Sequence, residues 1–185
     1  MNKFVFIDLD ETLIHTLYNC FSNNRVRVDF SSYIGGRSDM TPIRYGVLLR
    51  PNTHEFLKTV RGLYPNVYML TAATSEYGQK MNDVFNLGFT SEEIIGRDLW
   101  NAIYANSPKL HRFTNDPCYS VLIDNEHPKD KNACDKINYL KTFGKAYYIR
   151  IKGYYGSDKD ELTESIINDL VNDAKEGFIK MHTNQ

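Results

Sequence analysis

The feature that most constrains this chain is a regular alternation of short apolar runs with longer amphipathic segments. The apolar runs lie at 4–8, 67–71, 119–124 and 146–151. Runs that are apolar nearly throughout are typical of parallel strands covered on both faces. Helical patterns lie between them at 53–64, 76–85 and 129–143, and a last one spans about 160–175. This order predicts a three-layer α/β/α, Rossmann-like fold with a central parallel sheet.

One segment, residues 19–47, interrupts this alternation. Polar and apolar residues alternate over 25–30, a Gly35-Gly36 pair follows, and a second strand-like stretch lies near 43–49. The pattern predicts a β-hairpin-like insertion after the first strand, with one face exposed. Because the chain has no internal repeat and no Pro- or Ser-rich linker, we expect residues 1–185 to form a single domain.

Composition excludes several classes of protein. Hydrophobic residues make up 42% and charged residues 24% of the chain, as in ordinary globular proteins. No segment approaches the roughly 18 apolar residues of a membrane span, so we expect no membrane partner. Cys20, Cys118 and Cys134 lack the spacing of a disulfide framework or a zinc site. We therefore expect reduced thiols and a cytoplasmic location, or a nuclear one in a eukaryote.

Polar residues follow three of the predicted strands. Asp8 and Asp10 follow the first, Thr71 ends the second, and Asp124 and Asn125 end the third. Ligands of α/β proteins bind at the carboxyl ends of the parallel strands, so these side chains are expected to converge. Two carboxylates in one crevice repel each other unless a cation relieves the repulsion. Mg²⁺, which prefers oxygen ligands, is the natural candidate.

Lys109, ahead of the third strand, adds a positive charge to this set. Carboxylates for a metal, a hydroxyl and a lysine together favour phosphoryl transfer. The stretches DLDETLIHT, VLLRPNTHEFL, MLTAATSEYG and VLIDNEHP resemble the haloacid dehalogenase superfamily. Within that superfamily they are most similar to the small C-terminal-domain phosphatases and the NLI-interacting-factor-like proteins. The resemblance runs from Phe4 to about Leu170, and four motifs in order are a specific signal.

The resemblance implies a two-step hydrolysis of a phosphate monoester. Asp8 would be the nucleophile and form an aspartyl-phosphate. Asp10 would protonate the leaving group and then activate water. Thr71 would hydrogen-bond the transferring phosphoryl group, and Lys109 would neutralise charge on that group and on Asp8.

The resemblance also implies a Mg²⁺ site. Its ligands would be Asp8, the backbone carbonyl of Asp10, and Asn125, with Asp124 as a direct or water-mediated support. Thr12, at the end of the first motif, is a candidate substrate contact, although a role in orienting the loop is the stronger expectation.

The spacing of the motifs leaves no room for a large cap domain, so we expect an open site that accepts a phosphate on a macromolecule. The resemblance favours phosphoserine or phosphothreonine in a protein, and a polynucleotide or nucleotide phosphatase is the alternative. Arg25, Arg27 and Arg37 in the insertion would suit either anionic substrate. Tyrosines at 147, 148, 154 and 155 could stack on bases or serve the fold. A phospho-binding module without turnover would lack Asp8 or Asp10, and both are present.

Overall fold

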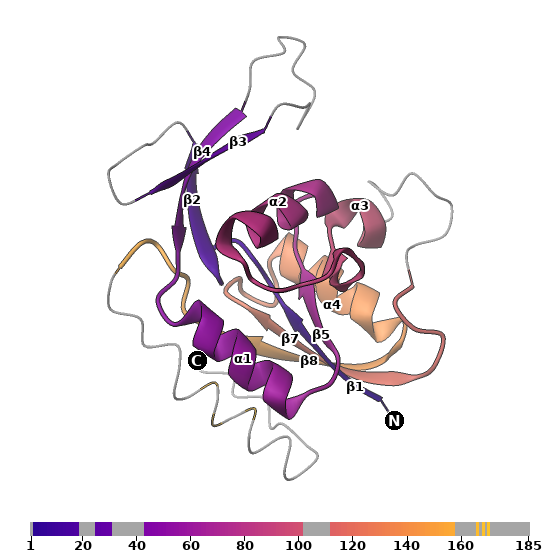
Figure 1. Ribbon diagram of the computed structural model, residues 1–185. Coiled ribbons are helices and arrows are strands. Elements are labelled where there is room, and N and C mark those ends of the chain that lie inside the picture. Colours follow the sequence, from indigo (N-terminus) through magenta and orange to yellow (C-terminus); the bar gives the residue numbers. More distant parts are fainter. Residues whose placement is uncertain are drawn as a thin grey trace.

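The computed structural model describes residues 2–18, 25–30, 43–101 and 112–157, together with 166, 168 and 170. This part of the chain contains a five-stranded sheet with helices on its faces and a separate three-stranded antiparallel sheet (Figure 1). The predicted α/β fold is thereby confirmed.

The five-stranded sheet is parallel throughout. Its strands in chain order are β1 (Asn2–Ile7), β5 (Val67–Leu70), β6 (Ile94–Ile95), β7 (Cys118–Asp124) and β8 (Gly144–Arg150). The four longer strands correspond to the predicted apolar runs, and every residue of β7 is buried, as expected for a strand covered on both faces. The two-residue edge strand β6 was not predicted.

The strand order β6-β5-β1-β7-β8 makes β1 the point at which the chain changes direction across the sheet. From β1 the chain runs to β5 and β6 on one side, and then to β7 and β8 on the other. Ile7 at the end of β1 pairs with Met69 of β5 and with Ile123 of β7. The carboxyl end of β1 therefore lies at the topological switch point, where α/β sheets bind their ligands.

Successive residues of β1 point into two different cores, one on each face of the sheet. The helices are α1 (Thr53–Leu63), α2 (Ser75–Phe85), α3 (Arg97–Trp100) and α4 (Lys131–Lys141), with a short 3₁₀ helix, η1 (Ser91–Glu93). Val5 and Ile7 pack in the core that α1 and α2 cover, whereas Phe4 and Phe6 pack in the core that α3 and α4 cover. Each strand of the sheet is thus held between two helical layers.

The predicted C-terminal helix lies mostly outside the described residues. Residues 166, 168 and 170 are helical, and Ile166 and Leu170 are buried in the same core as α1. The Tyr64 hydroxyl at the end of α1 donates to the Leu170 carbonyl oxygen at 3.1 Å. These contacts agree with the expectation that the helix packs on the sheet.

The insertion is larger than the predicted hairpin. Its strands are β2 (Ile14–Tyr18), β3 (Val26–Phe30) and β4 (Ile43–Leu49), in the order β2-β4-β3. The predicted hairpin corresponds to β3 and β4, which are antiparallel, but β2 adds a strand on the other side of β4. The antiparallel sheet therefore begins at Ile14 rather than at residue 19. It projects from the end of the main sheet at which β1 terminates (Figure 1).

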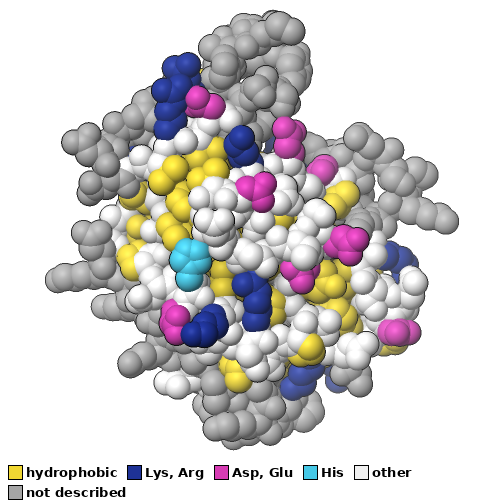
Figure 2. Space-filling view, viewed as in Figure 1, with side chains coloured by type: hydrophobic (Ala, Val, Ile, Leu, Met, Phe, Trp, Pro, Cys, Tyr) yellow, Lys and Arg dark blue, Asp and Glu magenta, His cyan; other side chains and the backbone are white. Residues whose placement is uncertain are grey.

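Hydrophobic and charged side chains share the outer part of the insertion. Leu17, Tyr18 and Val26 are exposed there, and Arg27 pairs with Asp29. Figure 2 shows basic and acidic side chains at the upper end of the molecule, beside a group of hydrophobic ones. Within the described residues, no helix combines the length and apolar character required to cross a bilayer.

Candidate active site

A tight turn after β1 sets the position of the two motif aspartates. The Asp8 amide donates to the Ile123 carbonyl oxygen of β7 at 2.9 Å, which continues the pairing of the parallel strands. The Leu9 carbonyl oxygen then accepts a hydrogen bond from the Thr12 amide, and Glu11 between them has the left-handed backbone angle φ = 60°. The chain therefore reverses at once, and both carboxyl groups stay at the end of the sheet.

Two distant segments brace the outer side of this turn. Arg50, which follows β4, donates from Nη1 to the Thr12 carbonyl oxygen at 3.0 Å and from Nη2 to that of Lys152 at 3.1 Å. The Tyr154 amide donates to the Glu11 carbonyl oxygen at 2.7 Å. The turn is thus held by the end of the insertion and by the loop after β8.

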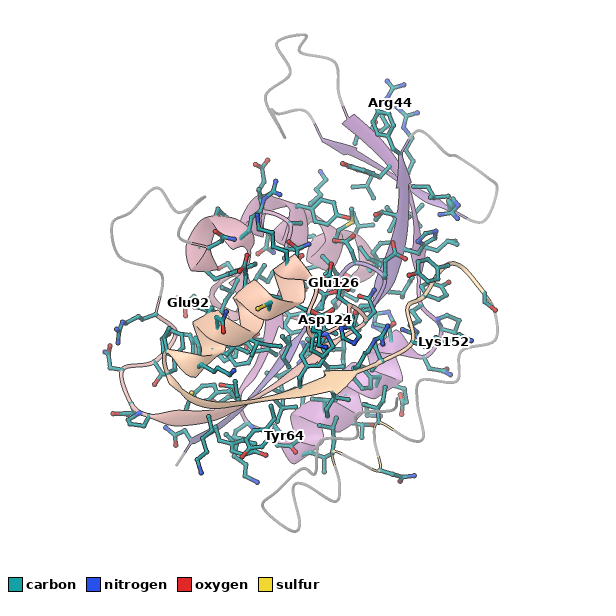
Figure 3. The ribbon with its side chains drawn as sticks, turned by 180° about the vertical axis from the view of Figure 1, so that it is seen from behind. Arg44, Tyr64, Glu92, Asp124, Glu126 and Lys152 are labelled. Carbon is teal, nitrogen blue, oxygen red and sulfur yellow. The ribbon has the colours of Figure 1, made fainter. Side chains whose placement is uncertain are left out.

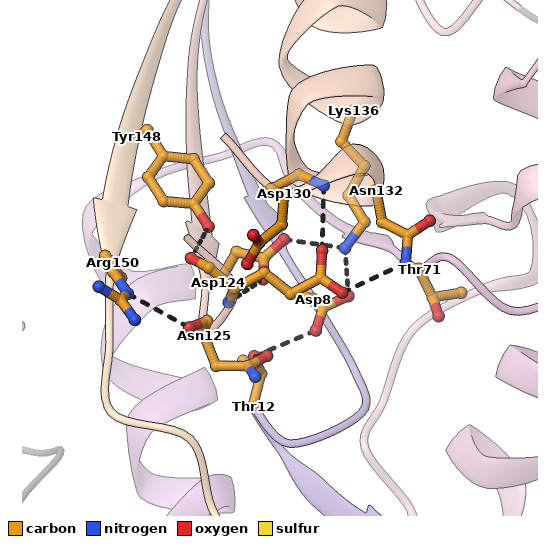
Figure 4. A network of polar contacts seen from close by, with 12 residues as sticks. Asp8, Thr12, Thr71, Asp124, Asn125, Asp130, Asn132, Lys136, Tyr148 and Arg150 are labelled. Atoms are coloured by element: carbon orange, nitrogen blue, oxygen red, sulfur yellow. Dashed lines mark hydrogen bonds and ion pairs between the residues drawn. The ribbon is translucent and has the colours of Figure 1, made fainter. Parts of the chain in front are cut away.

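Asp8 is buried among polar partners. Its Oδ1 accepts a hydrogen bond from the Lys136 ammonium at 2.7 Å, and its Oδ2 accepts one from the Thr12 hydroxyl at 3.1 Å (Figure 4). Burial raises the pKa of the Asp8 carboxyl to about 8, against the opposing effect of the Lys136 charge. The Lys136 ammonium favours the ionised form of Asp8, whereas burial and the nearby Asp124 charge favour the protonated form.

Lys136 is one of the site residues that the sequence interpretation did not indicate. It lies on α4, is 1% exposed, and donates from Nζ to Asp8 at 2.7 Å and to Asp124 at 2.8 Å. The two acids raise the pKa of the Lys136 ammonium even though burial opposes its charge. One signal was available: Lys136 stands three residues after the buried Ala133 and four before the buried Leu140, on the core-facing stripe of the helix.

Asp124 and Asn125 lie at the end of β7, as predicted. Asp124 is fully buried, with Oδ2 bonded to Lys136 and Oδ1 accepting the Glu126 amide at 2.9 Å. The Asn125 side-chain oxygen lies 3.1 Å from the Thr12 hydroxyl. Thr12, which is itself buried, therefore connects Asp8 with Asn125, a position that agrees with an orienting role.

Asp10 has a different kind of surroundings. Its Oδ1 accepts hydrogen bonds from the Tyr77 hydroxyl at 2.6 Å and from the Thr16 hydroxyl at 3.3 Å. Burial raises the pKa of the Asp10 carboxyl, and the Tyr77 hydrogen bond offsets part of that rise. A carboxyl group whose pKa is raised keeps its proton to higher pH, which suits a proton carrier.

Thr71 is buried at the end of β5. Its Oγ1 accepts a hydrogen bond from the Ala73 amide at 3.0 Å. The cap of the following helix α2 is Thr74, whose side chain accepts the Tyr77 amide. Thr71 is therefore not the residue that caps α2.

The insertion arginines differ from one another in position. Arg25 donates to the Gly46 carbonyl oxygen at 3.2 Å, and Arg27 forms an exposed ion pair with Asp29 at 2.9 Å. Arg37 and Lys109 lie outside the described residues. Seen from behind, Arg44 at the outer end of the insertion is far from Asp124 at the centre of the molecule (Figure 3). The charged tip of the insertion is thus remote from the Asp8 site.

The oxygen donors around Thr12 fit Mg²⁺. The Thr12 hydroxyl has one hydrogen but lies 3.1 Å from both Asp8 Oδ2 and Asn125 Oδ1, so two acceptor oxygens converge on one donor. Such oxygens are the ligands that Mg²⁺ prefers, with water completing its octahedron. No group of three or more His, Cys, Asp or Glu side chains in the described ranges could hold a metal ion. A Mg²⁺ ion bound here would be held by the Asp8 and Asn125 oxygens together with water.

A doubly wound parallel sheet with two aspartates after its central strand is the arrangement that the resemblance to the haloacid dehalogenase superfamily implies. The family model described as NLI interacting factor-like phosphatase matches residues 3–175. The chain belongs to this family, and membership indicates a phosphatase.

Two curated relatives are similar in sequence to part of this chain. It is 33% identical over 90 residues to the "CTD nuclear envelope phosphatase 1 homolog" proteins of Drosophila pseudoobscura pseudoobscura and Drosophila melanogaster. That match covers 46% of this chain and 36% of each relative, so the chain matches little more than a third of their length.

Solved structures of a further phosphatase share the fold. The structure of Fcp1, an essential RNA polymerase II CTD phosphatase, aligns with a TM-score of 0.52 and 14% identity. A variant of the fission yeast Fcp1 bound to beryllium fluoride gives the same TM-score and 15% identity. Each alignment covers 95% of this chain and about half of the other, 49% and 51%. At this identity the likeness concerns the fold alone.

Proposed function

We propose that the chain is a Mg²⁺-dependent phosphomonoesterase that acts through an aspartyl-phosphate, with phosphoserine or phosphothreonine in a protein as substrate. The observation that carries the proposal is the pair of aspartates on one turn with unlike surroundings. Asp8 lies against an ammonium group and a second acid, whereas Asp10 lies against hydroxyl groups. Phosphoryl transfer needs one carboxylate as nucleophile and one carboxyl group as proton carrier.

In the first step, an oxygen of the Asp8 carboxylate attacks phosphorus and the ester P–O bond breaks. Asp10 delivers its proton to the departing alkoxide oxygen, so the alcohol leaves neutral and Asp10 becomes a carboxylate. The hydrogen bond from the Tyr77 hydroxyl at 2.6 Å holds the Asp10 carboxyl group in place during this transfer.

In the second step, water attacks the phosphorus of the aspartyl-phosphate. Asp10, now a carboxylate, accepts a proton from this water, and the P–O bond to Asp8 breaks. Inorganic phosphate is released, and both aspartates return to their starting protonation states. Because Asp10 acts as an acid and then as a base, a raised pKa serves both steps.

Mg²⁺ would be held by Asp8, the Asp10 carbonyl and Asn125, with Asp124 as support. When bound, it would supply positive charge to the phosphoryl oxygens. The Thr12 hydroxyl lies beside the two side-chain oxygens, Asp8 Oδ2 and Asn125 Oδ1, that would bind the ion. Thr71, at the neighbouring strand end, is the candidate hydroxyl for the phosphoryl group.

Phosphate on a polypeptide is favoured over phosphate on nucleic acid. The curated relatives carry the name CTD nuclear envelope phosphatase, and the family model is one of phosphatases. Three of the four tyrosines considered for base stacking have structural contacts: Tyr147 stacks on Tyr119, Tyr148 donates to the Glu126 carbonyl oxygen, and Tyr154 is buried. Tyr155 is mostly exposed, and its ring lies edge-on to that of His15, with the ring centroids 5.8 Å apart. A cytoplasmic or nuclear location belongs to the same proposal.

The test is Mg²⁺-dependent phosphate release from a panel of substrates. The panel holds phosphoserine, phosphothreonine and phosphotyrosine peptides, oligonucleotides with 5′ or 3′ phosphate, and mononucleotides. Asp8→Asn is the matched control because it keeps the shape of the side chain and removes the nucleophile. We expect turnover of the phosphoserine or phosphothreonine peptides by the unaltered chain and none by Asp8→Asn.

Two results would contradict parts of this proposal. Preferred turnover of the oligonucleotides would replace the protein substrate by a nucleic-acid end. Binding of phosphopeptide with no release of phosphate from any substrate would indicate a binding module and remove the catalytic roles of Asp8 and Asp10.

A further inference from the structure

Glu126 connects three elements around the candidate metal site. Its amide donates to Asp124 Oδ1 at 2.9 Å, and its carbonyl oxygen accepts a hydrogen bond from the Tyr148 hydroxyl of β8 at 2.7 Å. Its carboxylate accepts hydrogen bonds from the Ala133 amide of α4 at 3.0 Å and from the Asn132 side-chain amide at 3.2 Å. One residue therefore ties the end of β7 to both β8 and α4.

The carboxylate of Glu126 caps α4 from outside the helix. Asp130 stands at the N-cap position, but its side chain accepts no cap hydrogen bond from the helix, and its Oδ2 instead accepts the His127 amide at 2.9 Å. The first turn of α4 contains no acidic residue of its own. Helix N-termini leave amides without intrahelical partners and favour negative charge, and Glu126 supplies both the acceptor and the charge. Its bond to Ala133 therefore fixes the loop after β7 against the helix.

Asn125 lies between two residues that are both held in place. Asp124 before it is the last residue of β7, and Glu126 after it is held by α4 and β8. In this position the Asn125 side-chain oxygen lies 3.1 Å from the Thr12 hydroxyl, which also contacts Asp8 (Figure 4). Residues that orient a metal ligand influence the affinity for the metal nearly as much as the ligands do. The placement of Asn125 is therefore the step at which Glu126 can affect the site.

The Glu126 side chain is a brace rather than a further ligand. Both of its carboxylate oxygens are engaged by the first turn of α4. Seen from behind, it lies at the end of α4 beside Asp124 (Figure 3). The contact from Arg150 to the Asn125 carbonyl oxygen is longer, at 3.5 Å, and comes from an exposed side chain. Without its carboxylate, Glu126 would hold this loop by its backbone alone.

We propose that Glu126 is a positioning residue for the metal site: by closing the first turn of α4 with its carboxylate, it holds the Asn125 oxygen beside Asp8. The inference rests on the Mg²⁺ site of the proposed function, because Asn125 and Asp8 would hold the ion there. In this role Glu126 touches neither the substrate nor the reacting atoms, and it exchanges no proton. It raises the affinity for Mg²⁺ and leaves the rate of the loaded enzyme unchanged.

The first test measures the binding of Mg²⁺ alone, by isothermal titration calorimetry without substrate. Glu126→Ala is expected to raise the Kd for Mg²⁺ by about 10–100-fold, the usual loss when a residue that orients a metal ligand is removed. Glu93→Ala is the matched control, because the Glu93 carboxylate also accepts a backbone amide, that of Thr90, at 2.9 Å. Glu93 precedes the edge strand β6, which β5 separates from β1, so its Kd is expected to stay within about twofold.

Glu126→Gln separates position from charge. Glutamine keeps an oxygen that can accept the Ala133 amide but carries no charge. We therefore expect Glu126→Gln to recover most of the Mg²⁺ affinity that Glu126→Ala loses. A loss in Glu126→Gln as large as that in Glu126→Ala would mean that the carboxylate acts through its charge, and would overturn the positioning role.

A second measurement follows phosphate release from the best substrate of the panel as the Mg²⁺ concentration is varied. In Glu126→Ala the Mg²⁺ concentration for half-maximal rate is expected to rise by about 10–100-fold, whereas kcat at saturating Mg²⁺ stays within about twofold. A general loss of folded protein would lower kcat at every Mg²⁺ concentration and leave the half-maximal concentration unchanged. Urea denaturation checks that Glu126→Ala and Glu93→Ala are folded and lose similar stability.

The outcomes separate this inference from the proposed function. An unchanged Kd for Mg²⁺ in Glu126→Ala, or an equal change in Glu93→Ala, overturns the role of Glu126 whether or not substrate is turned over. If Glu126→Ala binds Mg²⁺ more weakly than the unaltered chain but neither releases phosphate, the role of Glu126 stands and the proposed hydrolysis fails. If the unaltered chain binds no Mg²⁺, the inference is overturned together with the Mg²⁺ site of the proposed function.

Discussion

The Asp8 side of the site is built by the main sheet and α4, whereas the Asp10 side is built by the insertion and α2. On the first side, Lys136 and Asp124 surround the carboxylate with charge. On the second, the hydroxyls of Tyr77 and Thr16 are hydrogen-bond donors to the carboxyl group. Two aspartates on one turn are thereby given unlike chemistry by the elements that pack against them. The two sets of partners show that the packed residues around each aspartate, and not the motif alone, distinguish the proposed nucleophile from the proposed acid.

Replacing Asp8 and Asp10, one at a time, by asparagine is expected to give the largest difference between the two sides of the site. Asp8→Asn removes the nucleophile, so we expect no aspartyl-phosphate and no turnover. Asp10→Asn keeps the nucleophile, and we expect hydrolysis of a phosphoserine peptide to fall by about 10²–10⁴-fold. An activated aryl phosphate, whose leaving group needs no proton, should still phosphorylate Asp8 in Asp10→Asn. Acid-quenched samples with radiolabelled substrate measure the phosphoenzyme.

Labelled phosphoenzyme in Asp8→Asn would show that another residue is the nucleophile. Equal labelling of the unaltered chain and Asp10→Asn, with unchanged release of phosphate, would show that the two sides do not differ in their roles.

Tyr77→Phe removes one donor from the Asp10 side and leaves the Asp8 side unaltered. The Tyr77 hydrogen bond favours the charged form of Asp10, so its loss raises the pKa of that carboxyl further. Where hydrolysis of the aspartyl-phosphate limits kcat, Asp10 must be a carboxylate to activate water, so the rising limb of the kcat–pH profile should move to higher pH. Below that limb we expect kcat to fall by about tenfold, as for the loss of a hydrogen bond to a charged group. The measurement is kcat as a function of pH, from about 5 to about 9.

The control for Tyr77→Phe is the melting temperature of the same protein samples at neutral pH. A fall in kcat by the same factor at every pH would mean that Tyr77 acts on structure rather than on the protonation of Asp10. A limb that moves to lower pH would contradict the sign of its effect.

A pair of threonines gives the smallest and most closely matched test. Thr12 serves Asp8 in a buried contact at 3.1 Å, and Thr16 serves Asp10 in a part-buried contact at 3.3 Å. Thr12→Val leaves the buried Oδ2 of Asp8 without its hydroxyl donor and should lower the free energy of unfolding by about 1–3 kcal/mol. Thr16→Val should lower it by less than about 1 kcal/mol, since its bond is longer and less buried. Urea denaturation of both variants measures the difference, and equal losses would contradict it.

The main sheet was predictable because its strands are buried on both faces and are apolar nearly throughout. Strand β2 was not, because Ile14–Tyr18 carries polar residues and directly follows the motif turn, where a loop was the simpler interpretation. Within β6 the pairing covers two residues, too few for any periodicity. The local sequence pattern thus predicts strands that are buried on both faces. It misses strands, such as β2 and β6, that form only because a neighbouring strand pairs with them.

The candidate site was predictable where residues follow strands and not where a partner comes from elsewhere in the chain. Asp8, Thr71, Asp124 and Asn125 stand at strand ends that the parallel order brings together. Lys136 is separated from Asp8 by 128 positions. Its place on the buried stripe of α4 indicates that the lysine needs a partner, but only the packing of α4 against the sheet determines that the partner is Asp8.

The braces on the motif turn have a consequence for the time at which the protein can become active during synthesis. β1 is synthesised before every other described strand, yet the turn that follows it is fastened by Arg50, Lys152 and Tyr154. At ~5–20 residues per second, on the order of ten seconds separate the synthesis of Asp8 from that of its last brace. A ribosome-bound chain that ends within β7 holds both motif aspartates but neither Lys136 nor the loop after β8. We therefore infer that the proposed hydrolysis would begin only once the loop after β8 is made, rather than gradually as the motifs are synthesised.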